Sequence, residues 1–268
     1  MSLIIDGQRV QTPGLETISW LDDPAVPRVR DGRRRVPQSA RAIVLHTVHG
    51  KLGPLSDVPS APSTRAERYA RYQAGSAREV SWHLTVDTDG TVVQSNDPGT
   101  WYTRHAEHAT GYSIGIEMVQ QQDSPDLWQA QIDATVRLVT VLCEVFNIPK
   151  VTVVNASGAP ESGIVRDWQE ADEGGRQLAF NGVAGHRNLT RNKGPGDPGD
   201  LPFQALLAAG FRGVLPAVMT RAPGQPPARL ASGSSGSSGS RGSVSAGALT
   251  FLALAMGAAA AIVWWKGH

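Results

Sequence analysis

The sequence contains a single cysteine, Cys143, among its 268 residues. An intramolecular disulfide and a cysteine-based zinc cluster are therefore both excluded. Cys143 lies within an apolar helical pattern, where we expect a buried structural thiol. The N-terminal residues 1–10 also lack the basic start and the long apolar stretch of a secretory signal peptide. We therefore expect that the chain reaches the outside of a cell by release on lysis or by delivery in a particle rather than by ordinary secretion.

Acidic residues are missing from the last quarter of the chain. Residues 201–268 contain five basic residues and no Asp or Glu, whereas residues 1–200 carry 20 basic against 24 acidic residues, a net charge of −4. A basic tail suits a position near anionic lipid, and a solvated linker explains the same charges equally well. The mildly acidic head argues against nucleic acid as a partner.

The tail combines a tether with an uncharged stretch. Residues 216–243 are rich in Pro, Gly and Ser, which is typical of a flexible linker. Residues 244–265 then contain no charge and end in Trp264-Trp265, followed by Lys266. About 20 apolar residues span a bilayer, and Trp beside Lys is a common interfacial anchor. This pattern predicts a transmembrane helix that anchors the protein to a membrane.

The remaining chain predicts an N-terminal arm at 1–38 and a domain at 39–215. Within the domain, strand patterns alternate with helical ones. We expect strands at 41–46, 80–87, 91–94, 113–119, 151–154 and 182–185, and helices at 64–75 and from 124 onwards. This alternation indicates an α/β fold, a mixed central β-sheet flanked by helices. The irregular stretch at 155–181 is interpreted either as a lid over the site or as a surface excursion.

Three side chains that can bind metal stand at the ends of these elements. His46 and His186 each close a strand, and Asp197 lies in a turn rich in Gly and Pro. Two imidazoles and a carboxylate that leave one position open are the expected ligands of a catalytic zinc ion. Spacing alone is a weak signal, because isolated histidines are more often structural or exposed.

Five fragments around these residues resemble the type 2 N-acetylmuramoyl-L-alanine amidase family, which includes phage lysozyme-type amidases and peptidoglycan recognition proteins. They occur in the family's order between about 42 and 203: IVLHT at 43–47, VSWHL at 80–84 with DGTVVQ at 89–94, His105, SIGIE at 113–117, and GHR at 185–187 with DPG at 197–199. Each fragment alone is unspecific, but five in the right order make a chance match improbable.

The resemblance implies roles for individual residues. Zinc is expected on His46, His186 and Asp197, with Glu117 as the general base that takes a proton from water. Many family members place an oxyanion-stabilising lysine two residues before the third ligand. Here that position is a proline, and Lys193, four residues before Asp197, is either the substitute or a surface lysine.

The resemblance also implies a substrate and a reaction. Trp82 and His83 are expected to shape the substrate-binding site, and His105 to contact substrate. The implied reaction is zinc-dependent hydrolysis of the amide bond between N-acetylmuramic acid and L-alanine in peptidoglycan. Two other readings stay open: a non-catalytic peptidoglycan-binding module, and a structural component of a phage-like particle. Expected partners are peptidoglycan, a membrane through the C-terminal helix, and proteins of a phage-like or injection particle.

Overall fold

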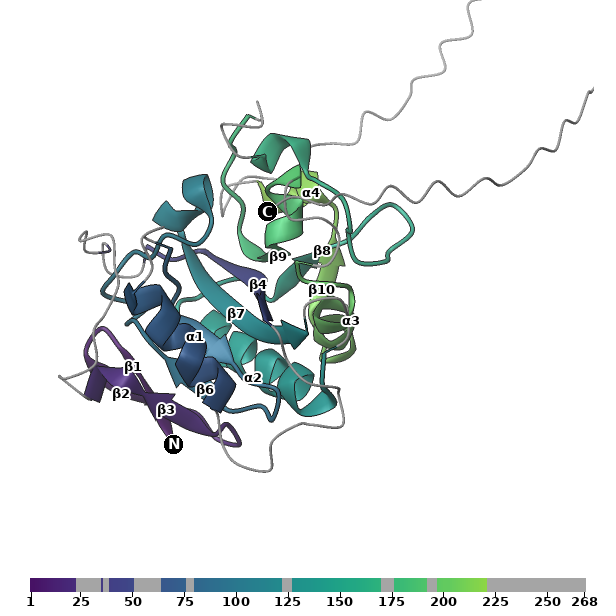
Figure 1. The fold of residues 1–268 in the computed structure, drawn as a ribbon. Helices are drawn as coiled ribbons and strands as arrows, with labels where there is room; N and C mark the ends of the chain where they lie inside the picture. Colours follow the sequence, from purple (N-terminus) through teal and green to yellow (C-terminus); the bar gives the residue numbers. More distant parts are fainter. Residues whose placement is uncertain are drawn as a thin grey trace, which may run out of the picture. The chain divides into compact units, whose positions relative to one another are not determined.

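The computed structural model describes residues 1–22, 35, 39–50, 64–75, 80–121, 127–169, 176–191 and 197–220. In this part of the chain, eight strands form one sheet in the order β10-β8-β9-β4-β7-β5-β6-β3 (Figure 1). The strands are β3 (Thr17–Ser19), β4 (Ala42–Gly50), β5 (Leu84–Val86), β6 (Val92–Gln94), β7 (Ser113–Gln121), β8 (Val151–Val153), β9 (Gly182–Gly185) and β10 (Arg212–Val214). Neighbouring strands are parallel except for the antiparallel pair β5–β6. The mixed central sheet fits the α/β fold expected from the sequence.

Helices cover both faces of this sheet. They are α1 (Thr64–Gly75), α2 (Gln129–Val145), α3 (Leu201–Ala208) and the short α4 (Pro216–Met219). Figure 1 shows α1 and α2 on opposite faces of the sheet. The expected helix at 64–75 is α1, and the helix expected from 124 onwards begins at Gln129.

The two faces of the sheet follow from side-chain alternation along β4 and β7. Ile43 and Leu45 of β4 belong to the main hydrophobic core beneath α2 and α3, together with Ile114 and Ile116 of β7. The residues between them point to the opposite face, where Val44 packs in a second hydrophobic cluster. By the same alternation, even-numbered residues of β4 and odd-numbered residues of β7 reach this second face.

The first 22 residues, which were expected to form part of a separate arm, pack against the domain. β1 (Ser2–Ile5) and β2 (Gln8–Gln11) form an antiparallel hairpin, and β3 pairs with β6 at the edge of the main sheet. Leu3, Ile5 and Leu15 belong to the same hydrophobic core as the residues beneath α2. This segment therefore shares the domain's core, and the other domain boundaries stay predictions.

No helix in the described ranges is both long and apolar enough to cross a membrane. The longest of them, α2, has 17 residues and includes Asp133, Arg137 and Glu144, whereas a span needs about 20 mostly apolar residues. This finding corrects the expectation of a fold completed by a transmembrane helix, and with it the expected location at a membrane. The stretch 244–265 on which that expectation was based lies outside the described residues.

The irregular segment after β8 packs onto the second face of the sheet. Trp168 is fully buried and stacks on Phe180, with their ring centroids 4.5 Å apart. The backbone N–H of Val165 donates to the carbonyl oxygen of Asn188, and the Asn188 side chain donates to the carbonyls of Glu161 and Gly163. The described part of this segment therefore supports the turn that follows β9.

Replacing Trp168 with alanine tests this packing role. We expect Trp168→Ala to lower the free energy of unfolding by about 3–5 kcal/mol, because the substitution leaves a large cavity against Phe180. Leu178→Ala is the control, since Leu178 is 44% exposed and should change stability by less than about 1 kcal/mol. Urea denaturation followed by circular dichroism measures both, and equal effects of the two variants would contradict the packing role.

Candidate metal centre

Strand register places three chemically active side chains next to one another. In the parallel pair β4–β9, Leu45 lies opposite Gly185, the last residue of β9, so the residues that follow them, His46 and His186, are neighbours. In the parallel pair β4–β7, His46 lies opposite Glu117. Side chains at paired positions emerge on the same face of a sheet. The register therefore brings His186, His46 and Glu117 into a row on the second face.

Asp197 joins this row from a loop and is held by the residues that follow the two histidines. Its Oδ1 accepts a hydrogen bond of 2.8 Å from the backbone N–H of Thr47. Its carbonyl oxygen accepts another, also of 2.8 Å, from the backbone N–H of Arg187. Because β9 ends at Gly185, this edge of β4 is open for the aspartate beyond Leu45. Oδ2 is turned towards His186.

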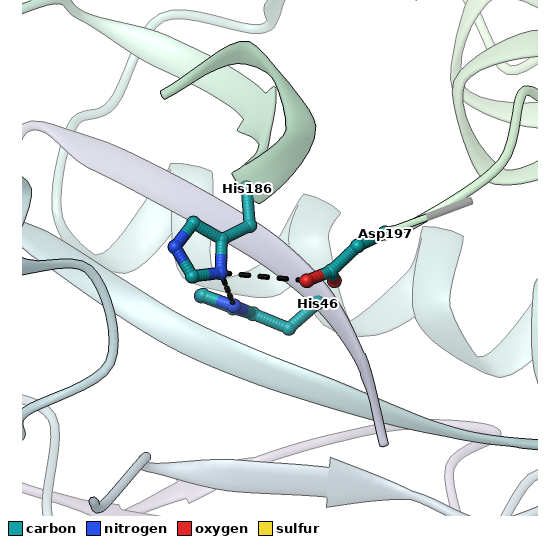
Figure 2. A group of neighbouring side chains, drawn as sticks. All are labelled: His46, His186 and Asp197. Carbon is teal, nitrogen blue, oxygen red and sulfur yellow. Dashed lines mark hydrogen bonds and ion pairs between the residues drawn. The ribbon is translucent and has the colours of Figure 1, made fainter. Parts of the chain in front are cut away.

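The ligand atoms of His46, His186 and Asp197 converge on one point, as Figure 2 shows. The two Nδ1 atoms are 2.9 Å apart, and His186 Nδ1 lies 3.4 Å from Asp197 Oδ2. All three side chains are buried, and their ligand atoms lie within 4.8 Å of one another. Two imidazole nitrogens and one carboxylate oxygen can hold a metal ion and leave a coordination position open.

The cluster opens into a cavity of about 370 Å³. Glu117 lines this cavity, with its Oε1 4.0 Å from His46 Nδ1. The other lining residues are His46, Thr47, Val48, Tyr72, Val80, Trp82, Arg104, His105, His186 and Asp197. A carboxylate at this position can exchange a proton with a molecule held beside the metal ligands.

The cavity contains residues that sequence reasoning did not single out. Tyr72, on α1, is 50% exposed at the cavity, and Arg104 is also exposed. A large aromatic residue on the polar side of an otherwise amphipathic helix was the available signal for Tyr72. Thr47 stood inside a quoted motif, but its role depends on its backbone N–H, which no side-chain pattern reveals.

His105 lines the cavity and is joined to both the metal cluster and the sheet. Its Nδ1 is 3.0 Å from His46 Nε2, and its Nε2 is 3.3 Å from the hydroxyl oxygen of Ser113. Burial is the main cause that lowers the pKa of His105 well below its ordinary value. The expected contact with substrate is thus compatible with its place on the cavity wall, while its ring nitrogens face other protein groups.

His83 is not among the residues that line the cavity, and it is fully buried. Its Nδ1 accepts a 3.0 Å hydrogen bond from the backbone N–H of Gly115. Because that nitrogen accepts, Nε2 carries the proton and donates it to the carbonyl oxygen of Trp101 at 3.0 Å. Burial lowers the pKa of His83 to about 3, so the ring is neutral. His83 therefore lies outside the cavity wall and links the backbone of Gly115 to that of Trp101.

Trp82 and Lys193 are the remaining two expected site residues. Trp82 lines the cavity, and its indole Nε1–H donates to Thr85 Oγ1 at 2.7 Å, which fixes the ring. Lys193 belongs to residues 192–196, which lie outside the described part of the chain. Its expected role next to the scissile carbonyl stays a prediction.

The chain is similar to one protein family and to several solved structures. A model of the N-acetylmuramoyl-L-alanine amidase family matches residues 36–200. No curated protein matches the chain. Among solved structures, an endolysin N-acetylmuramoyl-L-alanine amidase, LysCS from Clostridium intestinale URNW, is 12% identical, with a TM-score of 0.42 over 74% of this chain and 96% of its own. Drosophila peptidoglycan recognition protein SD is 15% identical, with a TM-score of 0.46 over 71% and 94%.

The buried, neutral His83 predicts a specific pH dependence of stability. The unfolded chain binds a proton to this residue below about pH 6.5, whereas the folded protein does so only near pH 3. The stability that neutral His83 contributes is therefore present above pH 6.5 and is lost as the pH falls, by about 1.4 kcal/mol per pH unit.

His83→Asn is the test, because the asparagine side-chain oxygen can accept from Gly115 N–H but does not titrate. We expect the variant to be less stable at pH 7 but to lose less stability than the wild type between pH 6 and pH 4.5. Urea denaturation in the presence of a chelator measures both proteins without a contribution from metal release. Parallel stability curves would show that His83 is not the titrating group.

Proposed function

Because the chain belongs to the N-acetylmuramoyl-L-alanine amidase family, we propose that it hydrolyses the amide bond between N-acetylmuramic acid and L-alanine in peptidoglycan. The observation that carries this proposal is the cluster of His46, His186 and Asp197, which opens into a cavity beside Glu117. These residues all lie inside the range matched by the family.

The metal in this proposal is zinc, held by His46, His186 and Asp197. The donor set fits, because two imidazole nitrogens and a carboxylate oxygen are a common protein ligand set of catalytic zinc. The hydrogen bond from Thr47 N–H to Oδ1 of Asp197 supports the fit further, since it leaves Oδ2 directed at the histidines. A bound zinc ion supplies Lewis-acid chemistry, which polarises a carbonyl group and lowers the pKa of a water molecule to about 7.

Glu117 is the proposed general base. Its carboxylate shares the cavity wall with the metal ligands, and Oε1 lies 4.0 Å from His46 Nδ1. A water molecule beside the ligands is therefore within reach of this carboxylate, which accepts the water's proton as the oxygen attacks the amide carbon. Glu117 then passes the proton to the amine nitrogen of L-alanine as the carbon–nitrogen bond breaks. The products are the free lactyl carboxylic acid and a stem peptide with a free amino terminus.

Substrate is held by the cavity walls. Trp82 offers a fixed aromatic surface, and Tyr72 offers an exposed one, which suits packing against a sugar ring or an alanine methyl group. Lys193 is proposed to stabilise the oxyanion of the tetrahedral intermediate, on the family resemblance alone.

Mass spectrometry of purified peptidoglycan, after incubation with the full chain and zinc, tests the proposed reaction. Release of intact stem peptides from uncut glycan strands is the expected result. Cleavage between sugars or within the stem peptide would assign a different bond. Sedimentation of the protein with peptidoglycan in the absence of any cleavage would instead identify a binding module.

The metal ligands generate the next prediction. His46→Ala, His186→Ala and Asp197→Ala should each abolish hydrolysis and lower the bound zinc, because a site with three protein ligands rarely survives the loss of one. Asp133→Ala, which removes an exposed carboxylate from α2, is the matched control and should retain both. Atomic absorption after dialysis gives the zinc content, and stoichiometric zinc in Asp197→Ala would reject that ligand.

The role of Glu117 is tested separately from metal binding. Glu117→Gln should retain zinc and fold yet lose activity by roughly a hundredfold or more, the usual scale for a general base. Glu144→Gln is the matched control, since Glu144 is exposed on α2 and pairs with Lys150. Initial rates of peptidoglycan hydrolysis compare the variants, and a near-wild-type rate for Glu117→Gln would place the proton transfer on another group.

A further inference from the structure

A chain of hydrogen bonds leads from β7 to the metal cluster, and the donors in it fix which atom of each pair carries the proton. It begins at Ser113, the first residue of β7, whose hydroxyl donates to the carbonyl oxygen of Ala109 at 2.6 Å. A carbonyl oxygen only accepts, so the single hydroxyl proton of Ser113 is used in this bond. Ser113 Oγ can therefore only accept from His105 Nε2, which lies 3.3 Å away.

The direction continues through His105 to His46. Since Nε2 of His105 carries the proton, Nδ1 of the neutral ring is an acceptor. Nδ1 of His105 lies 3.0 Å from Nε2 of His46, which must then be the donor. A neutral His46 that carries its proton on Nε2 has its ring lone pair on Nδ1, the atom that faces His186 Nδ1 at 2.9 Å and the metal position.

We propose that His105 is a positioning residue for the metal centre: it accepts the Nε2 proton of His46 and so fixes the tautomer in which Nδ1 of His46 can bind metal. The inference rests on the proposed metal-dependent function. It also assigns Ser113 and Ala109 as the anchor that orients His105. Metal-binding histidines commonly donate their other ring N–H to a protein group in this way, and removal of that group weakens metal binding about 10–100-fold.

A second feature of the fold makes room for this contact. Gly115 lies directly beneath the His105 ring, and a Cβ at Gly115 would lie 2.5 Å from His105 Cγ. Any side chain at this position of β7 would therefore displace the imidazole from His46. The backbone N–H of Gly115 donates to His83 Nδ1, and this hydrogen bond holds the part of β7 on which the His105 ring packs.

The same geometry argues against a direct polar role for His105 with substrate. Its two ring nitrogens are directed at His46 and Ser113. Although its ring lines the cavity, it offers its carbon edge rather than a free donor or acceptor. Its effect on the reaction is therefore exerted through His46.

Two substitutions of similar size distinguish the effect of the hydrogen-bond acceptor of His105 from the effect of its volume. His105→Asn places a side-chain oxygen near the position of Nδ1 and retains an acceptor for His46 Nε2–H. His105→Leu has nearly the same shape as asparagine but cannot accept. Ser113→Ala is a third variant, which removes the acceptor of His105 Nε2–H without touching the rings. Thermal unfolding of the zinc-free full chain shows which variants fold.

The readouts are zinc affinity and the tautomer of His46, both measured on the full chain without substrate. By competition with a chelator, His105→Leu should bind zinc 10–100-fold more weakly than the wild type. His105→Asn should stay within about threefold, and Ser113→Ala should be several-fold weaker. Long-range proton–nitrogen NMR of the zinc-free protein should show the His46 proton on Nε2 in the wild type and in His105→Asn.

These readouts separate the inference from the function on which it rests. Equal zinc affinities of His105→Leu and His105→Asn would overturn the role of the acceptor, as would a His46 proton on Nδ1 in the wild type. If His105→Leu does not fold, an unchanged zinc affinity of Ser113→Ala overturns the proposal, and a weakened one supports it. Failure of the wild-type protein to bind zinc, or to cut peptidoglycan, would instead reject the proposed function itself.

Discussion

The register of three parallel strands, β9, β4 and β7, is the constraint on which the site depends. If β4 shifted by one residue relative to β9 or β7, His46 would no longer lie beside His186 or Glu117. A shift of one residue also turns all side chains of the shifted strand to the opposite face of the sheet. The register is specified by the core beneath, because Leu45 and Ile116 alternate with the active residues and are fully buried. Packing on one face of the sheet therefore determines which reactive side chains lie next to one another on the other face.

Much of this arrangement was predictable from the sequence, and the limits have physical causes. Alternation and turn residues located most strands, and His46, His186 and Asp197 were identified as a set, with Glu117 beside them. The position of the N-terminal strands depends on long-range packing that local patterns do not encode. Residues 1–22 were interpreted as part of an arm because nothing in them reveals that β3 pairs with β6. The uncharged stretch at 244–265 predicted a membrane helix, and no helix in the described ranges is both long and apolar enough to be one.

The roles of the histidines show a further limit. From the sequence, His83 and His105 were assigned to substrate because both lie in fragments that resemble a peptidoglycan-cleaving family. In the structure, His83 accepts a hydrogen bond from the backbone N–H of Gly115, and His105 contacts His46. An imidazole has a donor and an acceptor, so its function is set by which neighbours each nitrogen meets. These neighbours lie 32 residues away in sequence for His83 and Gly115 and 59 for His105 and His46, and residue identity alone does not reveal them.

Burial raises the free-energy cost of leaving any of the histidine rings without a hydrogen-bond partner. His46, His83, His105 and His186 are all buried, so an unsatisfied or charged ring would carry a large desolvation cost. Burial lowers the pKa of His83 and of His105, and their ring N–H groups lead to backbone carbonyls, directly at Trp101 and through Ser113 at Ala109. Neutral rings are also what a divalent cation requires of its histidine ligands, because an imidazolium repels the cation and has no free lone pair. In the proposed arrangement, the buried His105 ring therefore supplies the acceptor that leaves Nδ1 of His46 to a metal ion.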